Sequence, residues 1–200
     1  MKFKFNLEML MAGAAMVTAV AAVVVAVIQT DIMREEAEME REHARLSVTP
    51  SLWIVHNWSD NPEDPFFSIV LANKGLGPAI IEHFSVSYEG QPLEHWDDLV
   101  ETVSDGKFSI AGENENINAW SLGGVAPGAI IPATSSFRPF QVGENASLIE
   151  ALIGQSDALK VSVCFCSVYG DCWNSEDEKR PKPVDQCTFD RKTYFGDYEG

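Results

Sequence analysis

The chain has 200 residues, and 30 Asp and Glu against 14 Lys and Arg give it a formal net charge of −16. Such an acidic chain is a poor candidate for binding nucleic acid or an anionic membrane surface, because a phosphate-binding face needs clustered cations. Most of the charge follows Leu46, where 9 basic and 23 acidic residues leave a net charge of −14. That part of the chain has the length of one ordinary domain.

An uncharged apolar stretch runs from Leu10 to Ile28. As a helix rising ~1.5 Å per residue it would span about 29 Å, which is close to the hydrocarbon thickness of a bilayer. We therefore expect residues 10–28 to form a transmembrane helix in contact with lipid. A cleaved signal peptide is the alternative, although the stretch is longer than an ordinary signal peptide's apolar core and no clear cleavage site follows it.

The charges beside this stretch differ on its two sides. Lys2 and Lys4 precede it, whereas acidic residues follow it from Asp31 onward. Because basic flanks stay in the cytoplasm, we expect residues 1–9 to form a cytoplasmic tail and everything after the helix to lie outside.

Small residues recur within the expected membrane helix at intervals of three and four, which places them on one helical face. Such a face lets a second membrane helix approach closely, so it predicts a homo-oligomer or contact with another membrane protein. The alanines of this helix-packing face are Ala12, Ala15, Ala19, Ala22 and Ala26.

Residues 29–46 contain neither Gly nor Pro and are rich in good helix formers, so we expect the helix to continue as a stalk. Ile32, Met39 and Leu46 are seven residues apart. These are too few heptads to predict a coiled coil, and a single-helix spacer is the favoured interpretation.

After the stalk, short apolar or alternating runs are separated by Gly, Pro, Asn and Asp, which is typical of β-sandwiches. The fold expected for residues 47–173 is mainly β, an Ig-like antiparallel β-sandwich with one or two short helical insertions. The expected strands are residues 51–58, 66–73, 80–88, 117–122, 130–140 and 158–169. The expected helices are residues 93–103 and 146–153, with Asn145 as the cap of the second, and the polar loop 104–116 should be exposed and mobile.

A turn of the form Asn-x-Gly-x-Gly-Pro-Ala, from Asn73 to Ala79, connects two of these strands. Gly75 and Gly77 permit positive φ ahead of a proline that restricts φ, so the segment predicts a tight connection. It is not a dinucleotide-binding motif, because no helix follows it.

This turn, together with the run Cys164-Phe165-Cys166-Ser167-Val168-Tyr169-Gly170-Asp171-Cys172-Trp173, resembles uncharacterised single-pass membrane proteins of proteobacteria. The resemblance covers the anchor, the β-domain and these two motifs. It implies a bacterial inner-membrane protein with a periplasmic domain, and it implies no activity.

All four cysteines lie late in the chain, at Cys164, Cys166, Cys172 and Cys187. An even number outside the cytoplasm favours two disulfides. In a strand Cys164 and Cys166 share a face, and a turn after them would return Cys172 towards Cys166. The favoured pairing is Cys166 with Cys172 and Cys164 with Cys187. The second of these disulfides would link the charged tail 174–200 covalently to the sheet.

Two other roles for the cysteines stay open, a metal site and a redox role. Four thiolates suffice for tetrahedral zinc, but the spacing lacks the paired Cys-x2-Cys of structural zinc sites. It also lacks the Cys-x-x-Cys of thioredoxin-like proteins. We therefore expect no metal and no cofactor.

No recognisable catalytic motif occurs in the chain, so we expect no enzyme. The favoured function is an accessory or scaffold subunit of an envelope protein complex, which binds another membrane or periplasmic protein and no nucleic acid. A metal-binding or redox protein is one alternative. A pilin-like filament subunit is another, although the start of the chain lacks the glycine-preceded cleavage junction of pilins.

Overall fold

The computed structural model divides into two compact units, Met1–Leu46 and Ser47–Gly200. The residues that the structure describes are 7–61, 63–110, 118–120, 125–177, 179–188 and 190–196.

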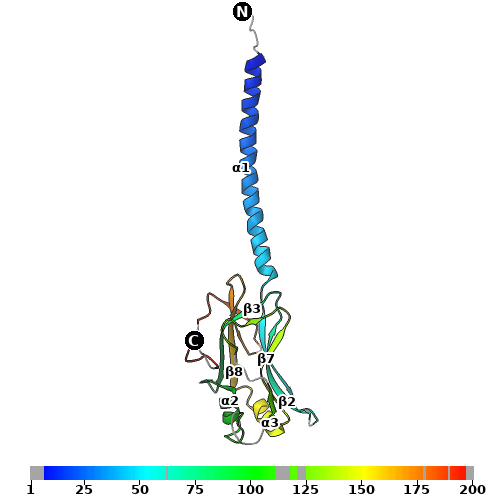
Figure 1. Ribbon diagram of the computed structural model, residues 1–200, viewed down its shortest axis with the longest axis vertical. Helices are drawn as coiled ribbons and strands as arrows, with labels where there is room; N and C mark the ends of the chain where they lie inside the picture. Colours follow the sequence, from blue (N-terminus) through cyan, green and yellow to red (C-terminus); the bar gives the residue numbers. More distant parts are fainter. Residues whose placement is uncertain are drawn as a thin grey trace, which may run out of the picture. The chain divides into compact units, whose positions relative to one another are not determined.

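The first unit consists of one long helix, α1 (Leu7–Ser47), drawn from blue to cyan in Figure 1. Its apolar side chains from Met9 onward are all exposed. Thr18 and Thr30 donate their hydroxyls to carbonyls one turn earlier, so these polar groups are satisfied inside the helix. The helix is long and apolar enough to cross a membrane, and it continues without a break through the expected stalk.

The second unit is built on two antiparallel sheets. One sheet has the strand order β1 (Leu52–Ser59), β2 (Phe66–Asn73), β7 (Ser136–Gly143) and β5 (Asn118–Trp120). The other has the order β10 (Lys182–Val184), β9 (Cys172–Glu176), β8 (Leu159–Cys166), β3 (Ala79–Tyr88) and β4 (Gln91–Leu93). A short strand, β6 (Ile130–Ile131), pairs with the start of β3.

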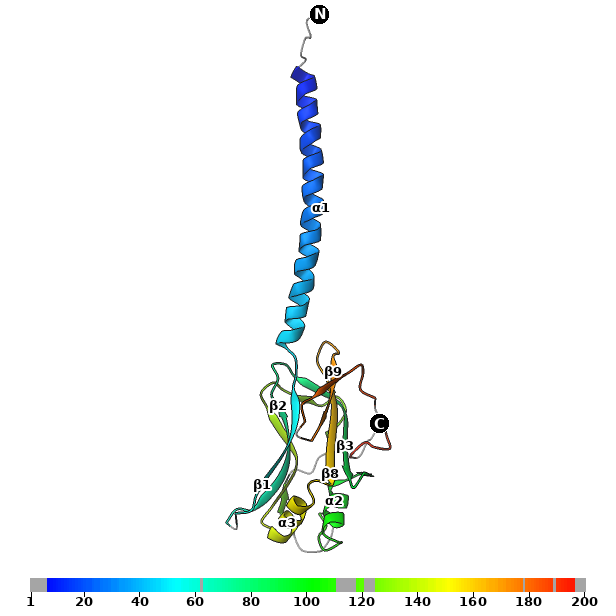
Figure 2. The same cartoon turned by 180° about the vertical axis from the view of Figure 1, so that it is seen from behind.

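The two sheets lie face to face over one hydrophobic core (Figures 1 and 2). The inward-facing residues of both sheets form this core, where Phe67 and Phe140 from the first sheet lie with Phe84 and Phe165 from the second. All four rings are fully buried. The expected mainly β architecture is therefore confirmed.

Two short helices, α2 (Trp96–Val103) and α3 (Ala146–Gly154), lie together at one end of the sheets (Figure 2). Asn145 caps α3 as expected, its side chain accepting the Leu148 amide at 3.0 Å. Trp96 brings α2 into the core, where its ring lies 4.7 Å from that of Phe140 and 4.4 Å from that of Phe195.

The expected strands 51–58, 66–73 and 80–88 begin and end within one residue of β1, β2 and β3, whereas the strand expected at 158–169 ends three residues earlier, at Cys166. The expected strand 130–140 does not run continuously. It divides into β6 and β7, and Thr134 between them has a φ of 57°. A left-handed residue cannot continue a strand, so the chain turns there and changes sheets. The expected strand 117–122 lies partly outside the described residues, and β5 is the part that is described.

The loop 104–116 was expected to be exposed, and residues 105–107 are exposed, but Ser104 and Phe108 are buried. Phe108 is 8% exposed, and the Asp97 carboxylate accepts hydrogen bonds from the Ser109 hydroxyl and the Ile110 amide. This mostly polar loop thus contains one aromatic side chain, Phe108, that is buried in the core. Residues 111–116 lie outside the described residues.

The C-terminal segment 174–200 was expected to be a charged tail, but parts of it are folded into the domain. The sheet continues past Trp173, where we expected the β-domain to end, because β9 runs to Glu176 and β10 pairs beside it. Phe195 is 1% exposed, and its amide donates to the Phe84 carbonyl at 3.1 Å. The segment therefore supplies part of the core.

Candidate functional site: a cluster of four cysteines

The cysteine cluster forms at one end of β8 and β9. On β8 the inward residues are Val163 and Phe165, so Cys164 and Cys166 point to the outer face of the sheet. Cys166 lies directly opposite Cys172 in the antiparallel pairing. The strand alternation thus places three of the cysteines on one surface.

The turn between β8 and β9 is held by Ser167, which is 4% exposed. Its amide donates to the Asp171 carbonyl at 2.7 Å, and its hydroxyl accepts from the amides of Tyr169 and Asp171. Gly170 has a φ of 83°, which glycine adopts without strain. Backbone hydrogen bonds and the Ser167 hydroxyl therefore hold this hairpin closed.

All four cysteines are bonded in two disulfides, Cys164–Cys187 and Cys166–Cys172. This is the pairing that the spacing favoured. Their Cα atoms lie 5.7 Å and 4.0 Å apart, respectively. Cys187 follows β10, so the first disulfide ties the C-terminal segment to β8.

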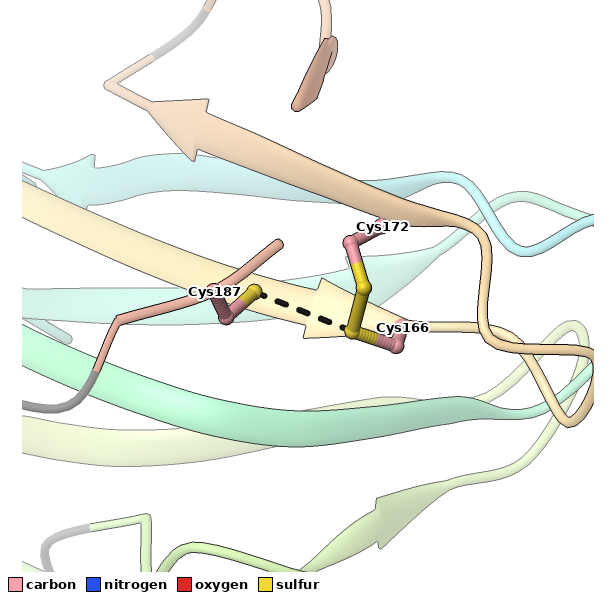
Figure 3. A group of neighbouring side chains, drawn as sticks. All are labelled: Cys166, Cys172 and Cys187. Carbon is pink, nitrogen blue, oxygen red and sulfur yellow. Dashed lines mark hydrogen bonds between the residues drawn. A yellow bond between two sulfur atoms is a disulfide. The ribbon is translucent and has the colours of Figure 1, made fainter. Parts of the chain in front are cut away.

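The two disulfides touch each other, and Figure 3 shows the contact between Cys187 and the Cys166–Cys172 disulfide. The Sγ of Cys166 lies 3.8 Å from the Sγ of Cys187, and the sulfurs of Cys166, Cys172 and Cys187 all lie within 4.8 Å of one another. Neither sulfur in this contact carries a proton, so it is a van der Waals contact between two disulfides. A disulfide sulfur also lacks the negative charge of the thiolate that binds zinc, so the oxidised cluster is not a zinc-ligand set.

His83 adjoins the cluster from β3, where it lies opposite Cys164 next to a β-bulge. Its Nε2 lies 3.3 Å from the Thr193 hydroxyl, and its ring centroid lies 6.2 Å from that of Tyr194. Burial lowers the pKa of His83 below 6.5, and the charge of Asp190 opposes this shift in part. A neutral imidazole at pH 7 therefore lies beside the Cys164–Cys187 disulfide.

A second histidine, His56, takes part in a buried pair elsewhere in the domain. Its Nε2 lies 3.4 Å from a carboxylate oxygen of Asp177, and the two side chains are 7% and 13% exposed. Asp177 also accepts the Val161 amide at 3.0 Å. The pair joins β1 of one sheet to the end of β9 in the other, which gives it a structural role. His43 lies on α1 and His95 precedes α2, so the histidines are not gathered into one site.

The Asn-x-Gly-x-Gly-Pro-Ala turn surrounds the buried side chain of Asn73. The amide oxygen accepts from the Ser51 and Gly75 amides, and the amide nitrogen donates to the carbonyls of Gly77 and Ile131. This single residue joins three separate stretches of the chain. Its position in the turn is therefore explained by hydrogen bonding.

The glycines of this turn have a different role from the one expected. Neither Gly75 nor Gly77 has positive φ. A Cβ at Gly77 would lie 1.6 Å from the Val48 carbonyl oxygen, and one at Gly75 would lie 2.3 Å from the Ser51 nitrogen. Glycine is needed here because the segment 48–51, where the chain begins the domain, passes directly against the turn.

The alanines of the expected helix-packing face all lie on α1 and are exposed. Their spacing keeps them on one side of a regular helix. They belong to the first unit, and the cysteine cluster belongs to the second.

Sequence reasoning missed two features of this region, the partnership of His83 with Cys164 and the sulfur contact between the disulfides. The register between β3 and β8 shifts at a bulge between Ile81 and His83. A bulge changes which residues lie opposite each other, and no pattern in the sequence predicts this one.

None of the protein-family models, curated proteins or solved structures compared with this chain matches it. The α1 helix, the β-domain and the cysteine cluster are therefore the features from which its function is inferred. The resemblance to proteobacterial single-pass proteins stays a prediction from two short motifs.

Proposed function

We propose that this chain is a single-pass protein of a bacterial inner membrane and an accessory or scaffold subunit of an envelope protein complex, with no catalysis of its own. In this proposal residues 1–9 are cytoplasmic, α1 provides the anchor and the stalk, and the β-domain is periplasmic. The basic residues before the apolar stretch and the acidic residues after it support this orientation. Disulfides are typical of proteins in oxidising compartments such as the periplasm, which supports the same location.

The strand order supports an Ig-like sandwich as the finer fold. In immunoglobulin domains one sheet has the strand order A-B-E-D and the other contains C, F and G. If β1, β2, β3, β5, β7, β8 and β9 take the places of A to G in chain order, the two sheets read A-B-E-D and G-F-C. Domains of this architecture often act as binding modules, because their loops are presented by a rigid pair of sheets.

The observation that carries the proposal is an apolar hollow of about 430 Å³ beside β6 and β7. Ile130 and Phe137 line it and are 61% and 38% exposed. Val125 and Pro132 also contribute, and no charged residue lines it among those that the structure describes. Exposed apolar surface around a concavity is typical of a site that another protein covers.

Affinity purification from native membranes tests this proposal. The full-length chain should retain a specific membrane or periplasmic partner, and Ile130→Asp should lose it because an aspartate in the hollow must be desolvated on binding. Val168→Asp is a matched control, since Val168 is 56% exposed but lies in the β8–β9 turn outside the hollow. Equal retention by both variants, or no partner for the wild type, contradicts the proposal.

The alanine face of α1 supports a second contact, within the bilayer. We propose that it packs against a membrane helix of a second copy or of the partner, because small side chains permit close approach of two helices. Replacing Ala15, Ala19 and Ala22 together by leucine should weaken association in membranes. The matched control is leucine at Ala14 and Ala21, which lie off this face. Unchanged association of the triple variant would remove the face from the proposal.

A further inference from the structure

We propose that the two disulfides form a relay for thiol–disulfide exchange. An external dithiol reduces one disulfide, and the freed thiolate then attacks the other disulfide through the contact between Cys166 and Cys187. This activity is independent of the scaffold function. The substrate class is a dithiol, carried by a small molecule or by another extracytoplasmic protein.

The order in which the four sulfurs are connected is the first argument. Cys164 is bonded to Cys187, Cys187 contacts Cys166 at 3.8 Å, and Cys166 is bonded to Cys172. The contact is thus made by the inner sulfur of each disulfide (Figure 3). Exchange requires a thiolate to reach a disulfide sulfur, and here the reacting atoms are already neighbours.

The reaction needs no added oxidant, because the Cys166–Cys172 disulfide takes up the two electrons of the dithiol. An external dithiol reduces Cys166–Cys172, is itself oxidised to a disulfide and leaves two thiols on the chain. The Cys166 thiolate then attacks the Sγ of Cys187, so that the Cys166–Cys187 bond forms, the Cys164–Cys187 bond breaks and Cys164 leaves as a thiolate that takes up a proton. The product carries a Cys166–Cys187 disulfide with thiols at Cys164 and Cys172.

The same product arises when the external dithiol reduces the other disulfide first. The freed Cys187 thiolate then attacks the Sγ of Cys166, and Cys172 leaves. Cys164, Cys172 and Cys187 are all half-buried, so each disulfide has an end near the surface. Because both routes use the contact between Cys166 and Cys187, both lead to the same two-electron-reduced state of the chain.

The position of Cys166–Cys172 is a second argument. It joins residues only six apart, in a hairpin that ladder pairing and the Ser167 hydrogen bonds already close. By loop closure it should stabilise the domain less than Cys164–Cys187, which spans 23 residues. Exchange chemistry gives the shorter disulfide a second role.

The relay also keeps the C-terminal segment attached. In the oxidised chain Cys187 is bonded to Cys164, and in the exchanged product it is bonded to Cys166, which lies two residues away on β8. The segment that carries Phe195 into the core is covalently held in both states. His83 lies opposite Cys164 in the strand pairing, and we assign its imidazole to proton exchange with the released thiol.

The test uses the full-length chain in detergent with one molar equivalent of dithiothreitol, followed by acid quenching and alkylation of free thiols. Cleavage after Phe165 and Tyr169 separates Cys164, Cys166 and Cys172, so mass spectrometry can assign each label. The relay predicts most of the label on Cys164 and Cys172, with a Cys166–Cys187 disulfide. Label on Cys166 and Cys172, on Cys164 and Cys187, or on no cysteine overturns the proposal.

Two single variants provide an independent test that needs no reductant. Cys172→Ser leaves Cys166 free beside Cys164–Cys187, and Cys164→Ser leaves Cys187 free beside Cys166–Cys172. The relay predicts a Cys166–Cys187 disulfide in both, with the free thiol moved to Cys164 in the first and to Cys172 in the second. A thiol that stays wholly on Cys166 or Cys187 in folded protein overturns it.

In the wild-type chain His83→Gln should slow the exchange several-fold without changing the final thiol distribution, and an unchanged rate removes His83 from the relay.

Discussion

The side-chain amide of Asn73 donates to the Gly77 carbonyl at 2.8 Å, from the first residue of the turn to its fifth. The same side chain accepts from the Ser51 amide at 3.1 Å, so it also binds the stretch that precedes β1. Asn73 is 1% exposed. Its hydrogen bonds therefore form away from water, where unpaired polar groups are costly.

Asn73→Ala should lower the free energy of unfolding by about 3 kcal/mol, because several buried backbone groups lose their partner at once. Urea unfolding of the full-length chain in detergent, followed by tryptophan fluorescence, measures this change. Asn57→Ala is the control, since Asn57 is exposed on β1 and should cost about 0.5 kcal/mol or less. Equal losses in both variants would contradict the role assigned to Asn73.

Gly77→Ala should destabilise the domain by about 3 kcal/mol, because the added methyl group overlaps the Val48 carbonyl and the backbone must move. Gly154→Ala is a matched control, because a Cβ there has no neighbour within 4 Å. Gly154 ends α3, where alanine is at least as good a helix former. Thermal unfolding of both variants is the measurement, and a lower midpoint for Gly154→Ala than for Gly77→Ala would refute the close-approach explanation.

The lowered pKa of His83 predicts how stability depends on pH. In the unfolded chain this histidine takes up its proton near pH 6.5, but the folded protein takes it up only at a lower pH. The unfolded state thus binds more protons in this window, so stability should fall as the pH falls from about 6.5 to the folded pKa. Stability should not change through His83 above that window.

His83→Gln should flatten this part of the pH profile, because glutamine does not titrate. Urea midpoints between pH 5 and pH 7.5 measure the slope in both proteins. An identical slope in the variant would show that other groups cause it.

The two disulfides should contribute unequally to stability. Replacing Cys164 and Cys187 together by serine should cost about 3.5 kcal/mol, and replacing Cys166 and Cys172 together should cost about 2 kcal/mol, because the longer closed loop constrains the unfolded chain more strongly. Urea unfolding without reductant compares the two double variants. The reverse order would mean that the short disulfide stabilises the hairpin by more than loop closure.

Local patterns in the sequence predicted the elements well where the pattern decides the structure. The alternation of Val161, Val163 and Phe165 with polar residues predicted β8, and the uncharged stretch from Leu10 predicted the apolar part of α1. The disulfide pairing could also be anticipated, because it follows from a strand, a turn and a return strand. Each of these inferences depends only on residues close in sequence.

Predictions failed where the structure of a segment depends on contacts with residues far away in the sequence. The charged segment after Trp173 reads as a tail, yet the cavity beside Phe84 and Trp96 accepts Phe195 from its end. The glycines of the Asn73 turn read as residues with positive φ, yet the nearby backbone of Val48 is what requires them. Neither neighbour can be inferred from the turn or the tail alone.

The amino-acid sequence is enough to predict an apolar N-terminal helix, an acidic β-domain and cysteines suited to two disulfides, because periodicity, charge and short spacings are local properties. The contact of Cys166 with Cys187 and the position of His83 opposite Cys164 become visible in the folded chain and not before. These contacts depend on strand register, a bulge and the return of the C-terminal segment. They arise when the chain packs, since long-range pairing sets which side chains become neighbours.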